Sequence, residues 1–419
     1  MKYVIIGACA AGLACAEQIR KEDSDGEITV FTKENYLPYS RPSVSYFLKG
    51  KVKESDMYLR KKSEYSSKRI DIVTGAEVKS IDKEKKTVSV GKKTIPYDKL
   101  CLCTGSKPFV PPVKNAEGKT NAFTFLDLDS VKKVKAKANS KTKAVVIGAG
   151  LIGMKAAEGL SVICESVDVV ELAPRILPAV LDEKSSKSVK KYVEEKGGIR
   201  FHLGDTVVEA KGKGKTITSV LLKSGKELEC DLLVLAVGVR PETALAENAG
   251  LEVNRGIITD PVTMRTSDEN IYAAGDCSVS VDMLDGSKKI IALWPNAVYQ
   301  GSAAGSQMAG GSLELTGAYA VNAVDFYGLR ICTCGLINAA GEQYSDKTVQ
   351  KDGKYKRLVF EGNRLVGYVL INDVENAGIY TSIIENKTDL TTLKDDVFDT
   401  PSLLMFESAE REKRLKGVI

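Results

Sequence analysis

In two stretches of the chain, a short apolar run, a glycine-rich break, a helical pattern and a second apolar run follow one another. In the clearer copy the first run is residues 145–147, and the second is the valine-rich stretch 166–170, which also contains Ser166 and Asp168. Short and wholly apolar runs are typical of strands that are buried in a parallel sheet. The pattern therefore predicts a strand, a crossover helix and a second, parallel strand between residues 143 and 171.

The break between these runs has the spacing G-x-G-x-x-G, with Gly148, Gly150 and Gly153. The first glycine permits a tight turn, the second lets the backbone approach a pyrophosphate, and the third lets the helix pack on the strand. The helix N-terminus adds free N–H groups for an anion. Glu171 follows the second strand, where an acid binds an adenosine ribose. We predict a dinucleotide site here, with a glycine turn that binds nothing as the alternative.

Residues 3–34 repeat the arrangement around the turn GACAAG and end in Glu34. Gly7 and Gly12 hold the first and third glycine positions, but Cys9 stands at the second, so a side chain must fit beside the pyrophosphate. Cys is small, and we expect a second dinucleotide site. The predicted strand, helix and strand are residues 3–6, 13–21 and 27–31.

Three further positions favour ligand contact. Tyr39 and Arg41 lie in the proline-containing segment 35–50, and an arginine fork suits a diphosphate or a flavin, although a surface arginine beside proline is as common. Thr104-Gly105 follows a predicted strand and indicates a backbone turn at a cofactor. Asp276 follows the strand 271–274, where it either caps a helix or binds a sugar-like hydroxyl chain.

The remaining segments predict three domains. Residues 70–100 and 199–237 alternate like antiparallel strands, and three prolines before residue 113 mark a crossing between domains. Residues 292–310 predict a closely packed Ala- and Gly-rich helix. Residues 319–373 again alternate like strands, and a helix through residue 384 and a polar tail follow.

Composition narrows the function classes. The 419 residues suit two to three domains, and 60 basic against 55 acidic residues give a net charge of only +5. We therefore expect no nucleic-acid partner. We expect the lysine-rich stretch 132–143 to be a solvated helix with its exit loop. No apolar run approaches the ~18 residues of a membrane span, and a strand at residue 3 leaves no room for a signal peptide, so we expect no membrane association and a cytoplasmic protein.

The cysteines do not form a recognisable metal or disulfide pattern, because none of the nine falls in a C-x-x-C pair. Two C-x-C pairs lie in apolar runs, where both thiols of a pair face one side of a strand. We expect buried, unreactive thiols and a structural role for His202, the only histidine. The cysteines are Cys9, Cys15, Cys101, Cys103, Cys164, Cys230, Cys277, Cys332 and Cys334.

The order of the blocks GACAAG, PYSRP, CTGSKP, GAGLIG, AVGVRP, YAAGDC and LWPNA resembles that of the FAD-dependent pyridine nucleotide oxidoreductases. The branch it resembles most includes NADH:rubredoxin oxidoreductase and the flavin module of NADH nitrite reductase. Pattern and resemblance together predict an α/β fold with two Rossmann-like dinucleotide-binding domains of three-layer ββα architecture, plus a C-terminal α+β domain. The expected domains are FAD-binding (1–112 and 242–316), NAD(H)-binding (113–241) and C-terminal (317–419).

The resemblance implies FAD and NAD(H) as cofactors and a residue set for each. The implied FAD-binding residues are Gly7, Cys9, Ala11, Gly12, Glu34, Arg41, Pro42, Val78, Thr104, Gly105, Asp276, Trp294, Asn296 and Ala297. The implied NAD(H)-binding residues are Gly148, Gly150, Ile152, Gly153, Glu171, Val237 and Gly238. In the family the acid of the GDC block binds the ribityl chain, which favours that role for Asp276.

Departures from the family narrow the implied chemistry. Disulfide-reducing members carry a C-x4-C pair or a cysteine near the position of Ser43, and often a C-terminal histidine, and this chain has none of these. A covalent mechanism on sulfur is therefore not supported. We expect hydride transfer between C4 of NAD(H) and N5 of FAD, with electrons exchanged with an iron–sulfur or rubredoxin-like protein or subunit. The alternatives are an NADH oxidase that uses oxygen, and a flavin-bearing subunit of a larger redox complex without independent turnover. An oligomer or hetero-complex is compatible with each.

Glu171 and Lys155 bear on the reaction directly. A carboxylate at Glu171 accepts from a free 2′-hydroxyl and repels a 2′-phosphate, which favours NADH, while Arg175 nearby keeps NADPH open. Lys155 lies two residues beyond Gly153, where the reductases that the chain resembles often hold Glu. We predict that Lys155 stabilises reduced, anionic flavin or holds a carboxylate. The alternative is a helix lysine that reaches for solvent.

Overall fold

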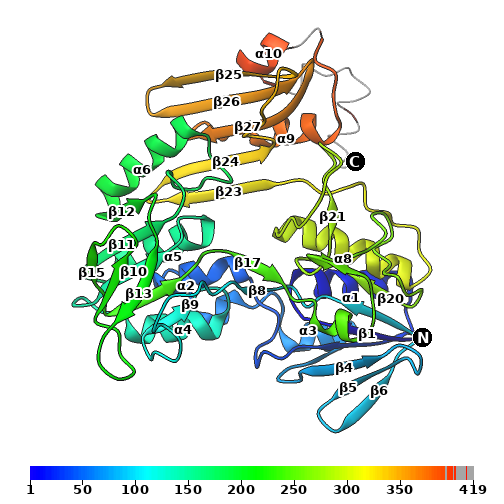
Figure 1. The fold of residues 1–419 in the computed structure, drawn as a ribbon. Coiled ribbons are helices and arrows are strands. Elements are labelled where there is room, and N and C mark those ends of the chain that lie inside the picture. Colours follow the sequence, from blue (N-terminus) through cyan, green and yellow to red (C-terminus); the bar gives the residue numbers. More distant parts are fainter. Residues whose placement is uncertain (392–393, 400, 403–411, 413–419) are drawn as a thin grey trace. The chain divides into compact units, whose positions relative to one another are not determined.

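The computed structural model describes residues 1–391, 394–399, 401–402 and 412. By the density of internal contacts the chain forms two compact units (Figure 1). The first unit is Met1–Val170 with Asp205–Tyr319, and the second is Glu171–Gly204 with Ala320–Ile419. The three domain boundaries expected from the sequence stay a prediction.

The first unit contains a parallel sheet whose strand order is β20-β7-β1-β2-β3. Along β1, Tyr3 and Ile5 pack in one apolar cluster with residues of α1 and α8, whereas Val4 and Ile6 pack in a second cluster on the other face. Both faces are therefore covered, which explains the wholly apolar run in the sequence. The strands are β1 (Lys2–Ile6), β2 (Glu27–Phe31), β3 (Ile70–Val73), β7 (Lys99–Leu102) and β20 (Ile271–Ala273).

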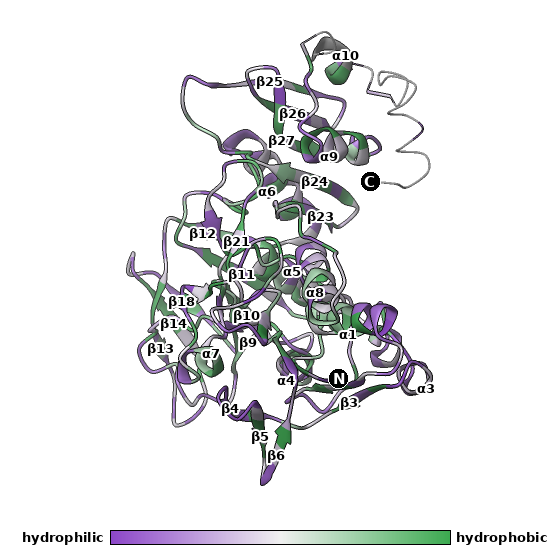
Figure 2. Ribbon diagram, turned by 90° about the vertical axis from the view of Figure 1, so that its right-hand side faces the viewer, coloured by the Kyte–Doolittle hydropathy of each residue, from purple (hydrophilic) through white to green (hydrophobic). Residues whose placement is uncertain are grey.

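The two faces are covered by different kinds of structure. Helices α1 (Ala10–Glu22) and α8 (Trp294–Met308) contribute to the first cluster, and the antiparallel strands β4 (Val78–Asp82), β5 (Thr87–Val90) and β6 (Lys93–Pro96) with α7 (Ala244–Asn248) contribute to the second. This is the three-layer ββα arrangement that the sequence predicted. α1 changes from hydrophobic in its first half to hydrophilic in its last turns (Figure 2), because all its buried residues except Ile19 lie between Ala10 and Ala16.

Helices α1 and α8 approach each other closely enough that glycine is required between them. A Cβ on Gly301 would lie 2.1 Å from the carbonyl oxygen of Ala11, and one on Gly305 would lie 2.4 Å from that of Cys15. Such distances are far below van der Waals contact, so the backbones touch. The Ala- and Gly-rich segment predicted to pack closely does so.

A second parallel sheet in the first unit includes β11 (Ser166–Glu171, whose last residue begins the second unit), β10 (Lys143–Ile147), β16 (Leu232–Leu235) and β9 (Ala122–Thr124). The antiparallel strands β13 (Val207–Lys211), β14 (Ser219–Leu222) and β15 (Glu227–Glu229) form an apolar cluster with β10 and β16. Helices α5 (Leu151–Ser161) and α4 (Leu128–Lys137) contact β10 and β9. The strands β8 (Ser106–Pro108) and β17 (Val239–Pro241) pair as an antiparallel ribbon. In the sequence, each of them follows a strand of one parallel sheet and precedes a strand of the other.

The second unit is built on an antiparallel sheet whose order is β23-β24-β27-β26-β25. Asp182 caps the N-terminus of α6 (Glu183–Gly197) and accepts a hydrogen bond from the hydroxyl of Tyr355 in the sheet at 3.0 Å. The remaining elements are β12 (Arg200–Leu203), β23 (Val321–Phe326), β24 (Leu329–Gly335), β25 (Tyr344–Lys351), β26 (Lys354–Glu361), β27 (Arg364–Ile371), α9 (Ala377–Glu385) and α10 (Lys394–Asp399).

Several short elements were not predicted. Residues 41–67 form short helices, and short β-pairs follow β17, because elements of so few residues show no hydrophobic period. The predicted helix 13–21 begins three residues earlier, at Ala10. Much of the predicted polar tail lies outside the described residues. The short elements are η1 (Arg41–Ser43), α2 (Val44–Leu48), η2 (Glu54–Met57), α3 (Lys62–Ser67), β18 (Val253–Asn254), β19 (Gly256–Ile257), β21 (Ser280–Val281) and β22 (Lys288–Lys289).

Within the described part of the chain, no helix is both long and apolar enough to cross a membrane. All nine cysteines are free thiols, and six of them are buried. The Cys101 and Cys103 sulfurs lie 3.5 Å apart, so this C-x-C pair faces one side of β7 as predicted. Cys332 is only partly buried, which corrects the expectation of buried thiols for the second C-x-C pair, and Cys9 and Cys164 are also partly buried.

We predict that Gly305→Ala destabilises the protein by about 1–3 kcal/mol, because the new methyl group meets the backbone of α1. Alanine gains ~1 kcal/mol over glycine in an unobstructed helix, so a net loss must come from this contact. Urea unfolding measures the effect. Ser302→Ala, a partly exposed position of the same helix, is the control and is expected to stay within about 0.5 kcal/mol. Equal stabilities would contradict the close packing.

Candidate functional site

The first glycine turn connects β1 to α1 and leaves no room for side chains at two positions. Gly7 has a φ of +110°, and a Cβ on it would lie 2.0 Å from the carbonyl oxygen of Cys103. A Cβ on Gly12 would lie 1.8 Å from the carbonyl oxygen of Gly7. The turn is thus held tightly between β7 and α1, and the free N–H groups of the first turn of α1 lie beside it.

Cys9, the departure from the glycine pattern, is the N-cap residue of α1. Its φ of −97° and ψ of −158° are extended values that any residue adopts, so the backbone does not require glycine here. The charge of the Arg41 guanidinium acts on this thiol. Burial raises the pKa of the Cys9 thiol, while the Arg41 charge opposes the rise. A protonated thiol is a poor nucleophile, which agrees with a packing role.

Arg41 connects Cys9 to the acid that ends the first β-α-β unit. Its guanidinium forms an ion pair with Glu34 and lies 5.5 Å from the centre of the Tyr39 ring. The Tyr39 hydroxyl also donates to Glu34, at 2.7 Å. Burial lowers the pKa of Arg41, but Cys9, Tyr39 and Glu34 raise it and prevail. The glycine turn therefore has a permanent cation beside it, as a diphosphate requires.

Asp276 belongs to the same group of charges. Its carboxylate accepts a hydrogen bond from the Ser106 hydroxyl at 3.0 Å. Burial raises the pKa of Asp276, and both Ser106 and the charge of Arg41 oppose this rise. Since Arg41 acts on both Cys9 and Asp276, the first glycine turn and the GDC block share one electrostatic environment.

The N-terminus of α8 packs on this environment. A Cβ on Gly275, whose φ is +85°, would lie 3.0 Å from the Cβ of Ala11 and 3.7 Å from that of Ala297. The buried Asn296 donates to the carbonyl oxygen of Tyr319 at 3.1 Å. Trp294, the first residue of α8, is partly buried against the apolar cluster of α1. Three sequence blocks that are far apart in the chain thus meet.

The β8–β17 ribbon brings two more predicted blocks together. The hydroxyl of Thr104 donates to the carbonyl oxygen of Glu242 at 2.6 Å, and the Glu242 N–H donates to Gly105 at 2.9 Å. The Phe109 N–H donates to Gly238 at 2.9 Å. The Thr104-Gly105 turn and the segment after Val237 are therefore neighbours across the ribbon.

The second glycine turn repeats the geometry of the first. A Cβ on Gly148, whose φ is +103°, would lie 2.4 Å from the carbonyl oxygen of Ala236, and one on Gly153 would lie 2.0 Å from that of Gly148. Gly150 is the N-cap of α5 and has an extended backbone. Ile152 lies partly buried in the first turn of this helix.

Lys155 is not a lysine that reaches for solvent. Its side chain is only 14% exposed, and its Nζ lies 2.6 Å from a carboxylate oxygen of Glu158 on the same helix. Lys49, which follows α2, lies 2.5 Å from the other oxygen of Glu158. The alternative that Lys155 reaches for solvent is therefore wrong. Its stabilisation of reduced flavin stays a prediction.

Glu171 and Arg175 belong to the second unit. The Glu171 carboxylate accepts a hydrogen bond from the Ala173 N–H at 2.8 Å. A guanidinium nitrogen of Arg175 lies 3.4 Å from the carbonyl oxygen of Pro178 and 3.5 Å from the amide oxygen of Asn338. Arg175 is therefore engaged by its own unit, which weakens the case for it as a phosphate ligand.

The other predicted residues lie at the edge of this arrangement, and several contributors were not predicted. Pro42 is exposed in η1, and Val78 is buried at the start of β4. The unpredicted contributors are Ser106, Gln300, Lys49 and Glu158. The sequence could have indicated two of them. Ser106 lies two residues after Thr104, and Glu158 lies three residues after Lys155 on the same helix. Gln300, which accepts from the Gly275 N–H at 2.7 Å, had none.

Open space at three other glycines fits a bound dinucleotide at each turn. A Cβ on Gly105, Gly150 or Gly238 would meet no atom within 4 Å. These positions differ from the four glycines that are closed by backbone contacts, and they leave a surface that a ligand can approach closely. With a cation at Arg41 and two helix N-termini, the residues present fit FAD on the first turn and NAD(H) on the second.

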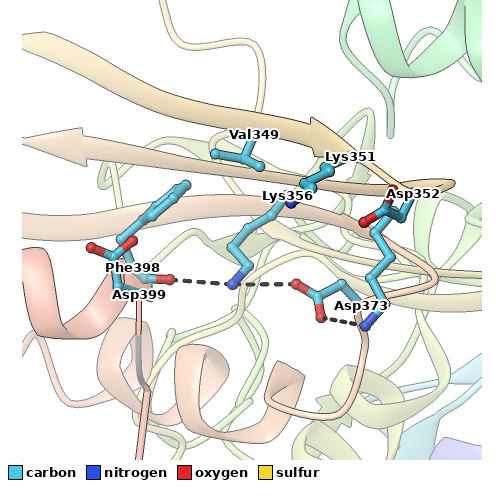
Figure 3. A pocket seen from close by; sticks show the side chains of 8 residues that line it. Val349, Lys351, Asp352, Lys356, Asp373, Phe398 and Asp399 are labelled. Atoms are coloured by element: carbon cyan, nitrogen blue, oxygen red, sulfur yellow. Dashed lines mark hydrogen bonds and ion pairs between the residues drawn. The ribbon is translucent and has the colours of Figure 1, made fainter.

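A pocket of about 260 Å³ in the second unit contains none of the predicted site residues (Figure 3). Two of its three lysines are engaged: Lys356 lies 3.2 Å from Asp373 and donates to the Phe398 carbonyl oxygen at 3.2 Å, and Lys354 lies 3.6 Å from Asp373. These contacts tie β26 to the segment before α9 and to α10. We assign the pocket a structural role.

Comparisons with known proteins agree with this geometry. The family described as pyridine nucleotide-disulphide oxidoreductase matches residues 1–301, and the rubredoxin NAD+ reductase C-terminal domain matches residues 321–388. The chain is 30% identical to the NADH-dependent phenylglyoxylate dehydrogenase subunit epsilon of Aromatoleum evansii, over 96% of this chain and 95% of the relative. It is 36% identical to an NADH oxidase of Methanocaldococcus jannaschii, over 74% and 70% respectively. A ferredoxin reductase structure from Rhodopseudomonas palustris superposes with a TM-score of 0.86 at 26% identity, over 96% of this chain and all of the other.

We predict that Gly150→Val raises the KM for NADH about tenfold or more and leaves the FAD content unchanged. The backbone at Gly150 is extended and the space around it is open, so valine should disturb only the approach of a ligand. Steady-state kinetics, flavin absorbance and thermal unfolding measure the three properties. A normal KM, or loss of FAD instead, would contradict the assignment of this turn to NAD(H).

A second prediction concerns Asp276→Asn. Because burial raises the pKa of this carboxyl, its charge costs stability above the raised pKa, and the amide should raise the unfolding temperature of the FAD-free protein at neutral pH. The gain should shrink as pH falls towards that pKa, since wild-type Asp276 then becomes neutral.

FAD affinity should fall about tenfold if the carboxylate binds the cofactor with a charge-assisted hydrogen bond. Unchanged affinity, measured by fluorescence titration, would remove Asp276 from the site.

Proposed function

The chain belongs to the pyridine nucleotide-disulphide oxidoreductase family, and from this premise we propose that it is an FAD-dependent NADH:acceptor oxidoreductase whose electron partner is an iron–sulfur or rubredoxin-like protein. It is an NAD(H)-dependent flavoprotein that uses FAD. One observation carries the proposal: two glycine turns of matching geometry, each between a parallel strand and a helix, lie in one unit with the charged residues Arg41, Glu34 and Asp276 at the first.

The residues of the chain would bind and orient the cofactors. Gly7 and Gly12 with the N-terminus of α1 would hold the FAD diphosphate, with Arg41 as its counter-charge, and Asp276 would accept hydrogen bonds from the ribityl chain. Gly148, Gly150 and the N-terminus of α5 would hold the NAD(H) diphosphate. Bound FAD supplies the redox chemistry, since it accepts a hydride and releases electrons singly. The protein contributes position and electrostatics.

A sulfur-based mechanism has little support. Ser43 stands near the place where disulfide-reducing relatives carry a cysteine, and its hydroxyl bonds to Ser40 at 2.9 Å. Cys9 lies within the first turn, and burial raises the pKa of its thiol. Without an activated thiol, the flavin must exchange its electrons with another acceptor or donor.

The iron–sulfur or rubredoxin-like partner rests on two relatives. The C-terminal part of the chain matches the domain described for rubredoxin NAD+ reductase, and the ferredoxin reductase of R. palustris matches over its whole length. The two alternative functions are also supported by relatives of the chain. The M. jannaschii protein is named an NADH oxidase, which supports oxygen, and the A. evansii protein is named a subunit, which supports a hetero-complex. A cytoplasmic location and the oligomeric state stay predictions.

Anaerobic stopped-flow mixing tests the proposal. NADH should bleach the absorbance of the bound flavin within the turnover time, and a rubredoxin or a small ferredoxin should then restore it. Air should restore it more slowly than the protein acceptor. Fast reoxidation by air alone would favour the oxidase, and turnover only after addition of a co-purifying complex would favour the subunit. Flavin that NADH leaves oxidised would refute the proposal.

NADH should reduce the flavin faster than NADPH at equal concentration. Glu171 would accept from the 2′-hydroxyl of NADH and repel a 2′-phosphate, and Arg175 is engaged by Pro178 and Asn338. We expect a preference of about tenfold or more in kcat/KM, and Glu171→Gln should reduce it. An unchanged preference in that variant would show that another residue selects the nucleotide.

A further inference from the structure

A buried group of charged side chains joins α2 to α5 in the first unit. Glu158 lies 2.5 Å from the Nζ of Lys49 and 2.6 Å from that of Lys155, through different carboxylate oxygens. The side chains of Glu158 and Lys49 are 3% and 5% exposed. The ring of Tyr46, in α2, lies 5.6 Å from Lys49 and 5.1 Å from Lys155. We call Lys49, Glu158 and Lys155 the α2–α5 triad.

The triad connects the two halves of the proposed site. α2 continues directly from η1, which contains Arg41, and α5 continues from the second glycine turn. Hydride transfer requires the two cofactor rings to be held in contact in a fixed orientation. The contact between α2 and α5 therefore joins the segment that follows the FAD-side arginine to the helix that follows the NAD(H)-side turn.

Stability alone explains this arrangement poorly. Removing charges from water costs several kcal/mol each, and apolar side chains of similar volume often serve a buried contact as well or better. Burial lowers the pKa of Lys49, Glu158 opposes that effect, and the neighbouring Lys155 adds to it. One carboxylate thus holds two cations that repel each other, and it keeps both at fixed positions on facing helices.

We propose that Glu158 is a positioning residue for hydride transfer, which fixes the Lys155 ammonium on the α2 side of α5 so that its charge favours the negative charge that reduction brings to the flavin. Lys49 holds the other oxygen of Glu158 and so orients the carboxylate. The inference rests on the proposed function and deepens it, because it assigns roles to two residues outside the glycine turns.

The test compares the FAD-loaded wild type with Glu158→Gln, Lys155→Gln and the double variant. The midpoint potential of the flavin and the rate of its reduction at saturating NADH are measured across pH. Each single variant should lower the rate about tenfold and the potential by about 30 mV, which is a tenfold change in a two-electron equilibrium. If Glu158 acts through Lys155, the double variant should equal Lys155→Gln rather than show the sum of both effects.

Lys135→Gln is the matched control. Lys135 lies on α4 and also packs against α2, where it donates to the Phe47 carbonyl oxygen at 2.8 Å and lies 4.3 Å from the Phe47 ring. This variant removes a lysine from the neighbouring contact between α2 and α4 without changing a ligand of Glu158. Its potential and reduction rate should match those of the wild type, and a shift equal to that of Glu158→Gln would overturn the proposal.

Glu158→Gln leaves a buried lysine without its carboxylate, so the variant risks unfolding. The double variant Lys49→Met/Glu158→Met replaces the buried pair with apolar side chains and also removes the carboxylate that Lys155 contacts, and it should show the same loss of rate and potential. Wild-type values in a folded variant that lacks Glu158, or additive effects with Lys155→Gln, would overturn the proposal. Failure of NADH to bleach the wild-type flavin would instead refute the proposed function.

Discussion

The close approach of a helix to the turn before it is the constraint on which both halves of the structure depend. A Cβ on Gly12 or Gly153 would lie 1.8 or 2.0 Å from the carbonyl oxygen of Gly7 or Gly148. Only glycine at these positions lets α1 and α5 begin directly above the strand ends. Their free N–H groups then converge where a phosphate group can bind, which is the physical reason that the same spacing occurs twice.

Charged groups lie at the two ends of the short segment from η1 to Lys49. On one side, Arg41 is paired with Glu34 and acts on Cys9 and Asp276. On the other side, Lys49 shares Glu158 with Lys155. Lys49 and Glu158 are buried, and buried charges of this kind add little net stability but fix side chains in one geometry. A segment too short to show a sequence period thus connects the charged residues of the FAD half to those of the NAD(H) half.

Elements with a clear hydrophobic pattern were predicted correctly, and elements too short to show such a pattern were not. The strands before Gly7 and Gly148 were predictable because burial on both faces requires a wholly apolar run. The packing of α8 was predictable because a close helix contact requires many Ala and Gly residues. The helices of residues 41–67 were not, since they are too short for a hydrophobic period. Lys155 was identified, but Lys49, which contacts the same carboxylate of Glu158, lies 106 positions before Lys155 in the numbering and had no local signal.

The sequence by itself determined the two β-α-β units, the glycines that close their turns and the acids that follow, because these depend on spacing within about thirty residues. Only the tertiary structure decided which distant side chains share an environment. It placed Ser106 on Asp276, Arg41 beside Cys9, and Lys49 on Glu158. Such pairs arise where separate elements pack, and the free energy that selects them comes from burial and charge neutralisation between elements rather than from any local pattern.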